Sequence, residues 1–396
     1  MFVALRENGT YISLAESWKL TDLQALRREE SFTCPACQSG VQLKLGNKVT
    51  FHFAHYKGAY CTVKTEPESE YHLQGKKQLF NWLHAQGYHV ILEPYLPHIS
   101  QRPDILVTIQ NQKYAIEFQC SQIEYSLFKK RTNAFMEVGI IPIWILGAKL
   151  FKRKTAYSIH LSSFQWLFAT SYSKNSHLSI LYYCPSTSQF LKASNIVTFS
   201  GTEAICDLFR LKENMVTFPA VLKDITPKYK LGKIWLEKKK SWRLRYSIYP
   251  SKNLSSFLTS LYVNRIPPSY LPGEIGVPVP SMFWFQTPSM IWQMWILLDV
   301  IIPTKVGDTF FFSKVMQNIS QRIVKHDILI RQLPLISHSQ YSAAVMEYLL
   351  LLEQFHIVKQ VNKTTFQKLE DIRIPTTIEQ AYEKDECILK KFGNCC

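Results

Sequence analysis

Two acidic residues in consecutive strand-like segments are the feature that most limits what this chain can fold into. Asp104 precedes the apolar run Ile105–Val107, and Glu117 lies within the run Tyr114–Phe118. An ionised carboxylate in an apolar strand is costly unless a cation is bound beside it. Neighbouring strands would let both carboxylates share one hard divalent ion, which prefers carboxylate and water oxygens. We therefore expect adjacent strands with a divalent-metal site at Asp104 and Glu117.

Gln119 adds a third polar group to this predicted site. Side chains alternate along a strand, so Gln119 lies on the same face as Glu117, about 6.6 Å further along. A metal held here would activate water against a phosphodiester. Glutamine can orient a water molecule or bind a metal weakly, but it supplies no positive charge.

The flanking segments place the strand pair inside a larger α/β unit. The sequence predicts a helix over 66–86, a strand over 89–95, the two carboxylate strands, a helix over 123–138 and a strand over 140–146. This alternation builds a mixed sheet with helices on its faces. The chain has 396 residues, enough for two or three domains. We place these at 1–65, 66–150 and 151–396, the last being basic and mainly helical.

A cysteine–histidine cluster characterises the first of these domains. A tetrahedral zinc (Zn²⁺) site needs four ligands, usually two from each of two turns. The simplest set is Cys34, Cys37, His55 and Cys61. His52 is the alternative to His55, because strand alternation sends the two rings to opposite faces. Reduced core cysteines beside a solvated histidine pair would be the plainer interpretation. The spacing favours a structural site in a zinc-ribbon-like domain with almost no core of its own.

The charge of the chain indicates a polyanionic partner. The net charge is +16, and residues 151–396 hold 30 Lys and Arg against 17 Asp and Glu. Within residues 228–246, cations alternate with aromatic rings, which suits single-stranded DNA because bases stack on the rings. The candidate contacts are Lys238, Lys239, Lys240, Trp242 and Arg243. An amphipathic hairpin with core aromatics and solvated lysines would give the same pattern.

Membrane and secreted classes do not fit the sequence. Residues 1–14 contain charges and a glycine turn where a signal peptide would need an apolar core. The most apolar run, 290–303, is too short to span a bilayer and is expected to form a buried helix. We expect a reducing, cytoplasmic environment, in which a Cys-x-x-Cys pair binds metal more often than it forms a disulfide.

The motifs taken together resemble a known family. The helix, the Arg-Pro-Asp strand and the Glu-Phe-Gln strand resemble the PD-(D/E)xK nuclease superfamily, whose core has the order αβββαβ. Over about residues 1–150 the chain is similar to the bacterial competence protein CoiA family. The motifs that carry this resemblance are Cys34-Pro35-Ala36-Cys37, His52-Phe53-Ala54-His55, Glu70-Tyr71-His72 with Lys76, Arg102-Pro103-Asp104, Ile116-Glu117-Phe118-Gln119-Cys120-Ser121 and Ile141-Pro142-Ile143-Trp144-Ile145-Leu146.

This resemblance implies a site and a role. The nuclease-like set would be Glu70, His72, Lys76, Asp104, Glu117 and Gln119. Asp104 and Glu117 would hold Mg²⁺ or Mn²⁺, and Lys76 would replace the usual strand lysine, since Gln119 stands in its position. The family implies action on incoming single-stranded DNA during natural transformation and recombination, with a recombinase or other competence proteins as partners. The alternative is a non-catalytic DNA-binding or recombination-mediator protein with a degenerate nuclease site.

Overall fold

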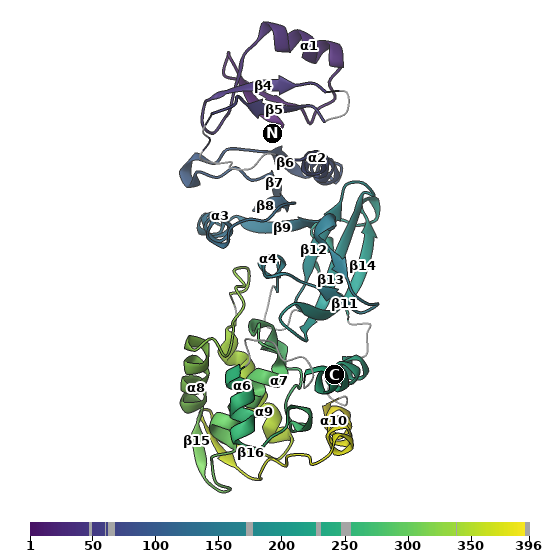
Figure 1. The fold of residues 1–396 in the computed structure, drawn as a ribbon. Helices are drawn as coiled ribbons and strands as arrows, with labels where there is room; N and C mark the ends of the chain where they lie inside the picture. The colour runs from purple at the N-terminus through teal and green to yellow at the C-terminus, as the bar shows by residue number, and fades with distance from the viewer. Residues whose placement is uncertain are drawn as a thin grey trace.

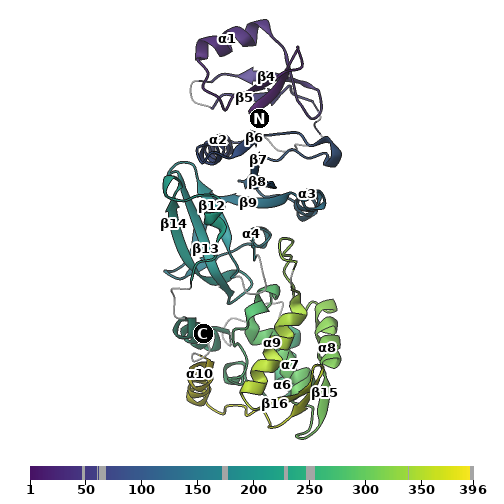
Figure 2. The ribbon, with the colours of Figure 1, turned by 180° about the vertical axis from the view of Figure 1, so that it is seen from behind.

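The computed structural model describes residues 1–46, 50–59, 61, 68–171, 177–226, 231–246, 255–337 and 339–392. Three regions follow one another along an elongated molecule, in the order of the chain (Figures 1 and 2). The fold is mixed α/β, as predicted.

The N-terminal region is a small antiparallel sheet with one helix, α1 (Leu20–Glu29). Its strands run in the order β2 (Tyr11–Ser13), β1 (Val3–Arg6), β3 (Phe32–Thr33), β4 (Gly40–Lys44) and β5 (His52–His55). Phe2 and Phe53 share one hydrophobic core with Leu73 and Leu79 of the next region. The small sheet is therefore packed onto its neighbour and has no separate core.

The middle region has the predicted order of helix, three strands, helix and strand. These elements are α2 (Glu70–His84), β6 (His89–Leu92), β7 (Ile105–Ile109), β8 (Gln112–Gln119), α3 (Tyr125–Glu137) and β9 (Ile141–Gly147). Strands β6, β7 and β8 are antiparallel, and β8 pairs with β9 in parallel. Helix α2 begins at Glu70 and not at residue 66, because the Ser69 hydroxyl accepts a hydrogen bond from the His72 amide and caps the helix.

The sheet continues past residue 150, where we placed a domain boundary. It has nine strands in the order β10-β11-β14-β13-β12-β9-β8-β7-β6. The added strands are β10 (Lys152–Arg153), β11 (Ser158–His160), β12 (Ile180–Cys184), β13 (Gln189–Thr198) and β14 (Glu203–Lys212), and a short helix, α4 (Ser163–Trp166), precedes β12. Five strands thus lie within residues 151–212, at the start of the region 151–396 that we expected to be mainly helical. The physical reason is that β12 pairs with the apolar strand β9 and extends its sheet.

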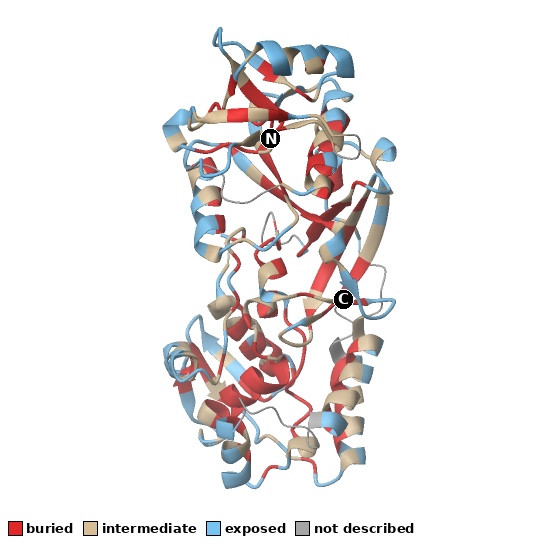
Figure 3. Ribbon diagram, turned by 45° about the horizontal axis from the view of Figure 1, so that its top comes forward, coloured by how far each residue is buried: buried red, intermediate tan, exposed pale blue. Residues whose placement is uncertain are grey.

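The C-terminal region is mainly helical, as expected. Its helices are α5 (Leu231–Tyr246), α6 (Ser255–Val263), α7 (Ser289–Ile296), α8 (Phe312–Val324), α9 (Tyr341–Gln354) and α10 (Ile378–Phe392). A small sheet contains β15 (Thr309–Phe311), β17 (Thr365–Lys368) and β16 (Val358–Asn362). Every residue of α7 is buried, and Figure 3 shows this red core. Among the described residues, no helix is both long and apolar enough to cross a membrane.

Candidate metal-ligand centres

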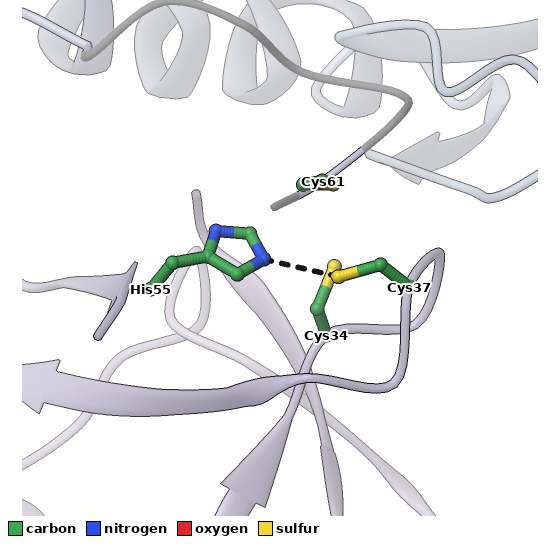
Figure 4. A group of neighbouring side chains, drawn as sticks. All are labelled: Cys34, Cys37, His55 and Cys61. Atoms are coloured by element: carbon green, nitrogen blue, oxygen red, sulfur yellow. Dashed lines mark hydrogen bonds between the residues drawn. The ribbon is translucent and has the colours of Figure 1, made fainter. Parts of the chain in front are cut away.

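The N-terminal cluster brings together the four residues predicted from spacing. Cys34 and Cys37 follow β3, His55 ends β5, and Cys61 comes from the segment after β5. Their ligand atoms all lie within 4.8 Å of one another. Figure 4 shows His55 directed at the two nearer cysteines, with its Nε2 atom 3.3 Å from Cys37 Sγ. Three sulfurs and one imidazole form a donor set that suits a tetrahedral, soft-ligand metal site.

The strand register decides between the two histidines. His55 lies opposite Val41 in β4, and His52 lies opposite Lys44. Val41 is buried, whereas Lys44 is exposed, so the two rings belong to opposite faces of the sheet. His52 Nδ1 lies 2.9 Å from the Thr50 carbonyl oxygen. The structure thus includes His55, and not His52, in the cluster.

The second centre begins with a row of acidic residues across three strands. Leu92 pairs with Ile105, and Ile105 pairs with Ile116. Glu93 follows Leu92, Asp104 precedes Ile105, and Glu117 follows Ile116. The Glu93 amide donates to the Asp104 carbonyl oxygen at 3.0 Å, which extends the ladder to this level. One carboxylate per strand therefore stands at the same end of β6, β7 and β8.

Asp104 is the carboxylate that meets helix α2. Its Oδ2 atom accepts a hydrogen bond from the Phe118 amide at 3.0 Å and lies 3.3 Å from His72 Nε2. Ligand atoms of Glu68, His72 and Asp104 lie within 4.8 Å of one another. The side chains of His72 and Asp104 are 18% and 15% exposed, so solvent reaches this group. Two carboxylates and an imidazole can bind a divalent ion here.

Lys76 lies beneath this group and holds it together. Its side chain is fully buried and its Nζ atom contacts Glu68, Glu93 and Asp104. Burial alone would lower the pKa of Lys76, but the three carboxylates raise it above its ordinary value. Burial would raise the pKa of Glu93, yet Lys76 lowers it to about 2. Lys76 is therefore a permanent charge among acids. We expected Lys76 to position a water molecule. Its side chain is buried and does not face solvent.

A close approach between helix and strand gives Lys76 this position. Gly75 lies against the Phe118 ring of β8, and a Cβ atom at Gly75 would stand 2.1 Å from a carbon of that ring. A distance this short is below any van der Waals contact, so only glycine allows α2 to pack this closely on β8. The next residue, Lys76, consequently reaches the carboxylates at the strand ends.

Glu117 has a different partner from the one we expected. It is 2% exposed, and its Oε1 atom lies 2.5 Å from Arg131 Nη2 on α3. Burial raises the pKa of Glu117 to about 8, and the Arg131 charge acts in the opposite direction. Glu117 is not among the residues gathered around Asp104 within 4.8 Å. In the structure Glu117 is bound to Arg131, and its sharing of one ion with Asp104 stays a prediction.

Glu70 and Gln119 are also held by neighbours of their own. The Glu70 carboxylate accepts hydrogen bonds from the Thr50 amide at 2.9 Å and the Thr50 hydroxyl at 2.6 Å. It therefore joins α2 to the N-terminal sheet. Gln119 Nε2 donates to the Ser121 carbonyl oxygen at 3.0 Å, within the loop that follows β8.

Our interpretation of the sequence missed Glu68 and Glu93. We assigned residue 68 to the interior of a helix, but Ser69 caps that helix and leaves Glu68 before it. The available signal was Ser69, a residue type that often caps helices, directly after Glu68. Glu93 follows strand β6. Strand β6 pairs with β7, which begins just after Asp104. Only the register of the hairpin could have revealed this.

Arg102 connects the two centres. It is 6% exposed, and its Nη1 atom lies 3.8 Å from Cys34 Sγ. Burial raises the pKa of the Cys34 thiol, while the Arg102 charge acts against that rise. Burial would lower the pKa of Arg102, but the charge of Glu93 helps to raise it, and the Glu93 carboxylate accepts a hydrogen bond from the Phe2 amide at 2.9 Å. The Arg-Pro-Asp motif thus contacts the cysteine cluster with its arginine and the carboxylate centre with its aspartate.

Two of the predicted DNA contacts on α5, Lys239 and Arg243, require correction, and the other three stay predictions. Lys239 is 1% exposed and Arg243 is fully buried, and both bind Asp385 of α10 at 2.8 Å. Their charges are therefore used inside the fold and not offered to phosphates. Lys238 pairs with Glu203, Lys240 lies 2.8 Å from Glu386, and Trp242 packs on the C-terminal core. Residues 228–230 of this segment lie outside the described residues.

Comparisons with known proteins agree with this architecture. Three family models match: the N-terminal domain of competence protein CoiA over residues 15–64, its nuclease-like domain over 68–226 and its C-terminal domain over 232–382. A curated relative, "Competence protein CoiA" of Bacillus subtilis (strain 168), is 31% identical over 348 residues. The alignment covers 87% of this chain and 91% of that protein. No solved structure matches. The chain, with its cysteine–histidine cluster and its nuclease-like domain, belongs to the CoiA family of competence proteins.

Proposed function

We propose that this protein processes incoming single-stranded DNA in the cytoplasm during natural transformation, with a metal-dependent endonuclease-like centre at Asp104. The observation that carries the proposal is the group formed by Glu68, His72 and Asp104, whose ligand atoms lie within 4.8 Å of one another. It stands at the solvent-accessible end of the strands in the domain that a nuclease-like family model matches. The family name of the relative supports the biological role.

The donor set fits a hard divalent ion such as Mg²⁺ or Mn²⁺. Carboxylate oxygens are preferred ligands, and partial exposure of Asp104 leaves room for water. Glu68, just before α2, and His72 of α2 would complete the site, and Glu117 remains the ligand predicted from the strand pattern. A bound ion would lower the pKa of a coordinated water and supply the nucleophile.

The chain's own residues have distinct tasks in this proposal. Lys76 fixes the Asp104 and Glu68 carboxylates, since it is buried and bound to both. His72 lies 3.3 Å from Asp104 Oδ2 and is partly exposed, so its ring would bind the ion beside Asp104. Arg131 holds Glu117 ready on the neighbouring strand.

Cleavage assays test this function directly. Purified protein with Mn²⁺ or Mg²⁺ is expected to cut single-stranded or branched DNA. Asp104→Asn should lower the rate at least about a hundredfold, because removing a metal ligand's charge disables water activation. Glu137→Gln is the matched control, since Glu137 is an exposed acid at the far end of α3. If wild-type protein binds DNA but never cuts it, the proposal fails.

We further propose Zn²⁺ as the ion of the cluster formed by Cys34, Cys37, His55 and Cys61. The cluster offers four protein ligands, and Cys34 and Cys61 are buried, which suits a structural and not a catalytic role. Elemental analysis should find one zinc per chain in wild-type protein and much less in Cys37→Ser. Cys120→Ser, which alters a half-buried cysteine outside the cluster, should retain the metal.

A non-catalytic role in DNA binding or recombination mediation is the second candidate. It is favoured by the basic partners that Asp104 and Glu117 already have in Lys76 and Arg131. In that case the protein would bind DNA and a recombinase or other competence proteins. The double variant Asp104→Ala, Glu117→Ala separates the two candidates. Normal transformation frequency at normal protein abundance would favour mediation, and loss of transformation would favour catalysis.

A further inference from the structure

A groove of about 640 Å³ lies on the N-terminal region, on the face turned away from the cysteine cluster. Its walls come from the end of α1, from β4 and from β5 with the residue that follows it. The side chains that give it chemical character are Arg27, Gln42, Lys44, His52 and Tyr56. Neither the family comparisons nor the proposed catalytic centre accounts for this surface.

The register explains why polar residues face the groove. Gln42 lies opposite Ala54, and Lys44 lies opposite His52, so these residues share one face of the β4–β5 pair. The opposite face carries Leu43 and Phe53, which are 3% and 1% exposed. The strands therefore use one face for the core and leave a polar face open.

Tyr56 supplies an aromatic surface at the edge of this face. Its side chain is 57% exposed, and its ring rests on Gly40, where an added Cβ atom would lie 3.3 Å from the ring. Glycine at this position leaves room for the edge of the ring beside the strand. A large apolar ring that stays exposed in this way offers its other face to a planar ligand.

The charges of the groove favour an anion. Arg27 and Lys44 are both exposed. The acid in the lining, Glu30, is bound by Arg6 and its pKa is lowered by that hydrogen bond. Its charge is therefore already compensated, and the two lining cations dominate. Cations beside an exposed aromatic ring form the combination that binds a single-stranded nucleic acid, through phosphates and stacked bases respectively.

We propose that this groove binds single-stranded DNA, with Tyr56 stacked on a base and Arg27 and Lys44 on phosphates. The inference rests on the proposed function and specifies where its substrate is held. His52 lines the groove, and its ring bonds the Thr50 carbonyl, while Thr50 itself bonds Glu70. Glu70 opens α2, the helix that carries His72 to Asp104. A strand bound in the groove is thus next to the helix that bears the carboxylate centre.

Fluorescence anisotropy with a short labelled oligothymidylate and the full-length chain tests the site. Tyr56→Ala should weaken binding about tenfold, whereas Tyr56→Phe should bind as the wild type does. The double variant Arg27→Gln, Lys44→Gln should also bind weakly. It should reduce the slope of log affinity against log salt by about 1.4, because two phosphate contacts are lost.

Two matched controls lie in the same domain. Arg28→Gln removes an exposed cation of α1 beside Arg27, outside the groove lining. Tyr11→Ala removes a 66% exposed ring from β2, the opposite edge of the five-stranded sheet. Both should bind as the wild type does. Equal loss in the controls and the groove variants, or no loss in either, overturns the proposal, as does a wild type that binds no oligothymidylate.

A cleavage assay on the same proteins separates this proposal from the proposed function. Asp104→Asn should retain oligothymidylate binding while losing cleavage. If the groove variants bind and cut normally, the groove proposal alone fails. If wild-type protein binds through the groove but cuts no DNA form, the groove proposal stands and the catalytic one fails. Binding of an acidic peptide in preference to DNA would assign the groove to a protein partner and overturn the proposal.

Discussion

Two buried lysines, Lys76 in the nuclease-like domain and Lys239 in the C-terminal region, show how the same residue type, buried on a helix, has different roles. Each lies on a helix with its side chain at most 1% exposed. Lys76 contacts three carboxylates from separate segments. Lys239 contacts one, Asp385, and shares it with the buried Arg243. Three carboxylates surround the first lysine, with the Met1 ammonium bound to Glu68 as a second cation, whereas two cations share one carboxylate around the second.

The pKa values of the two lysines move in opposite directions for this reason. Carboxylates raise the pKa of Lys76 despite its burial. For Lys239, burial lowers the pKa, and the attraction of Asp385 does not make up for that effect. The surroundings differ too, since the Asp104 side chain is 15% exposed and that of Asp385 is fully buried. An acid-rich, accessible centre can take a further cation, whereas a base-rich, closed one only joins α5 to α10.

The largest expected effect comes from removing the shared acid of the closed centre. Asp385→Asn leaves two buried cations without a counter-charge, which should lower the free energy of unfolding by the upper end of ~3–5 kcal/mol. Urea denaturation measures this loss. Divalent cations should not restore the stability, because the centre is already basic. Restoration by Mn²⁺ would contradict the contrast between the two centres.

Removing the lysine of the open centre should cost somewhat less. Lys76→Met leaves three carboxylates with the Met1 ammonium, which binds Glu68, as their remaining contacting cation, and we expect a loss of about 3 kcal/mol in the free energy of unfolding. Here Mn²⁺ should restore part of the stability by binding in place of the ammonium group. Urea denaturation with and without Mn²⁺ measures the restoration, with Asp385→Asn as the control. Equal responses of the two variants to Mn²⁺ would remove the distinction.

The pH dependence of stability examines the acid-rich side further. Burial raises the pKa of Glu117 to about 8, so the folded protein binds a proton that the unfolded chain has released above about pH 4.5. The contribution of Glu117 to the free energy of unfolding should therefore decrease as the pH rises from about 4.5 to about 8. Glu117→Gln should lack this decrease and gain stability relative to wild type toward pH 8.

Urea midpoints of wild type and Glu117→Gln, taken across that pH range, provide the measurement. Glu93 does not interfere, because its pKa is lowered to about 2 and its contribution is lost only at acid pH below this window. A constant difference between wild type and variant at every pH would show that Arg131 keeps Glu117 ionised throughout.

The smallest effect is expected at the partly exposed pair of Lys238 and Glu203. Lys238→Gln leaves Glu203 with a second partner, Lys154, at 3.3 Å. Since such pairs contribute little, the free energy of unfolding should change by less than about 1 kcal/mol. DNA binding should also change less than in the Arg27→Gln, Lys44→Gln variant. A larger loss of DNA binding in Lys238→Gln would show that α5 contributes to the nucleic-acid interface.

The sequence was sufficient for elements whose evidence is local. Apolar runs predicted β7 and β8, and the spacing of Cys34 and Cys37 predicted that these two residues share a metal-ligand cluster. These signals need only neighbouring residues. The predicted order of helix, three strands, helix and strand is confirmed on the same basis.

Long-range pairing explains what the sequence did not show. Arg243 and Asp385 are separated by 142 positions, so nothing local distinguished a buried cation of α5 from a solvated one. The pair of Glu117 and Arg131 depends on how α3 packs across the sheet. The extension of that sheet beyond residue 150 depends on β12 choosing β9 as its neighbour. Each of these features depends on which distant segment a residue or strand contacts. The periodicity of the sequence does not specify such contacts.

Gly75 offers a way to alter the carboxylate centre without changing any charge. Its missing side chain is what lets α2 and the Phe118 ring touch. A single methyl group there would act as a spacer that lifts the helix off the strand and draws Lys76 back from the acids it neutralises. The position of the charged group of Lys76 therefore depends on the separation of α2 and β8, which is set by an uncharged glycine.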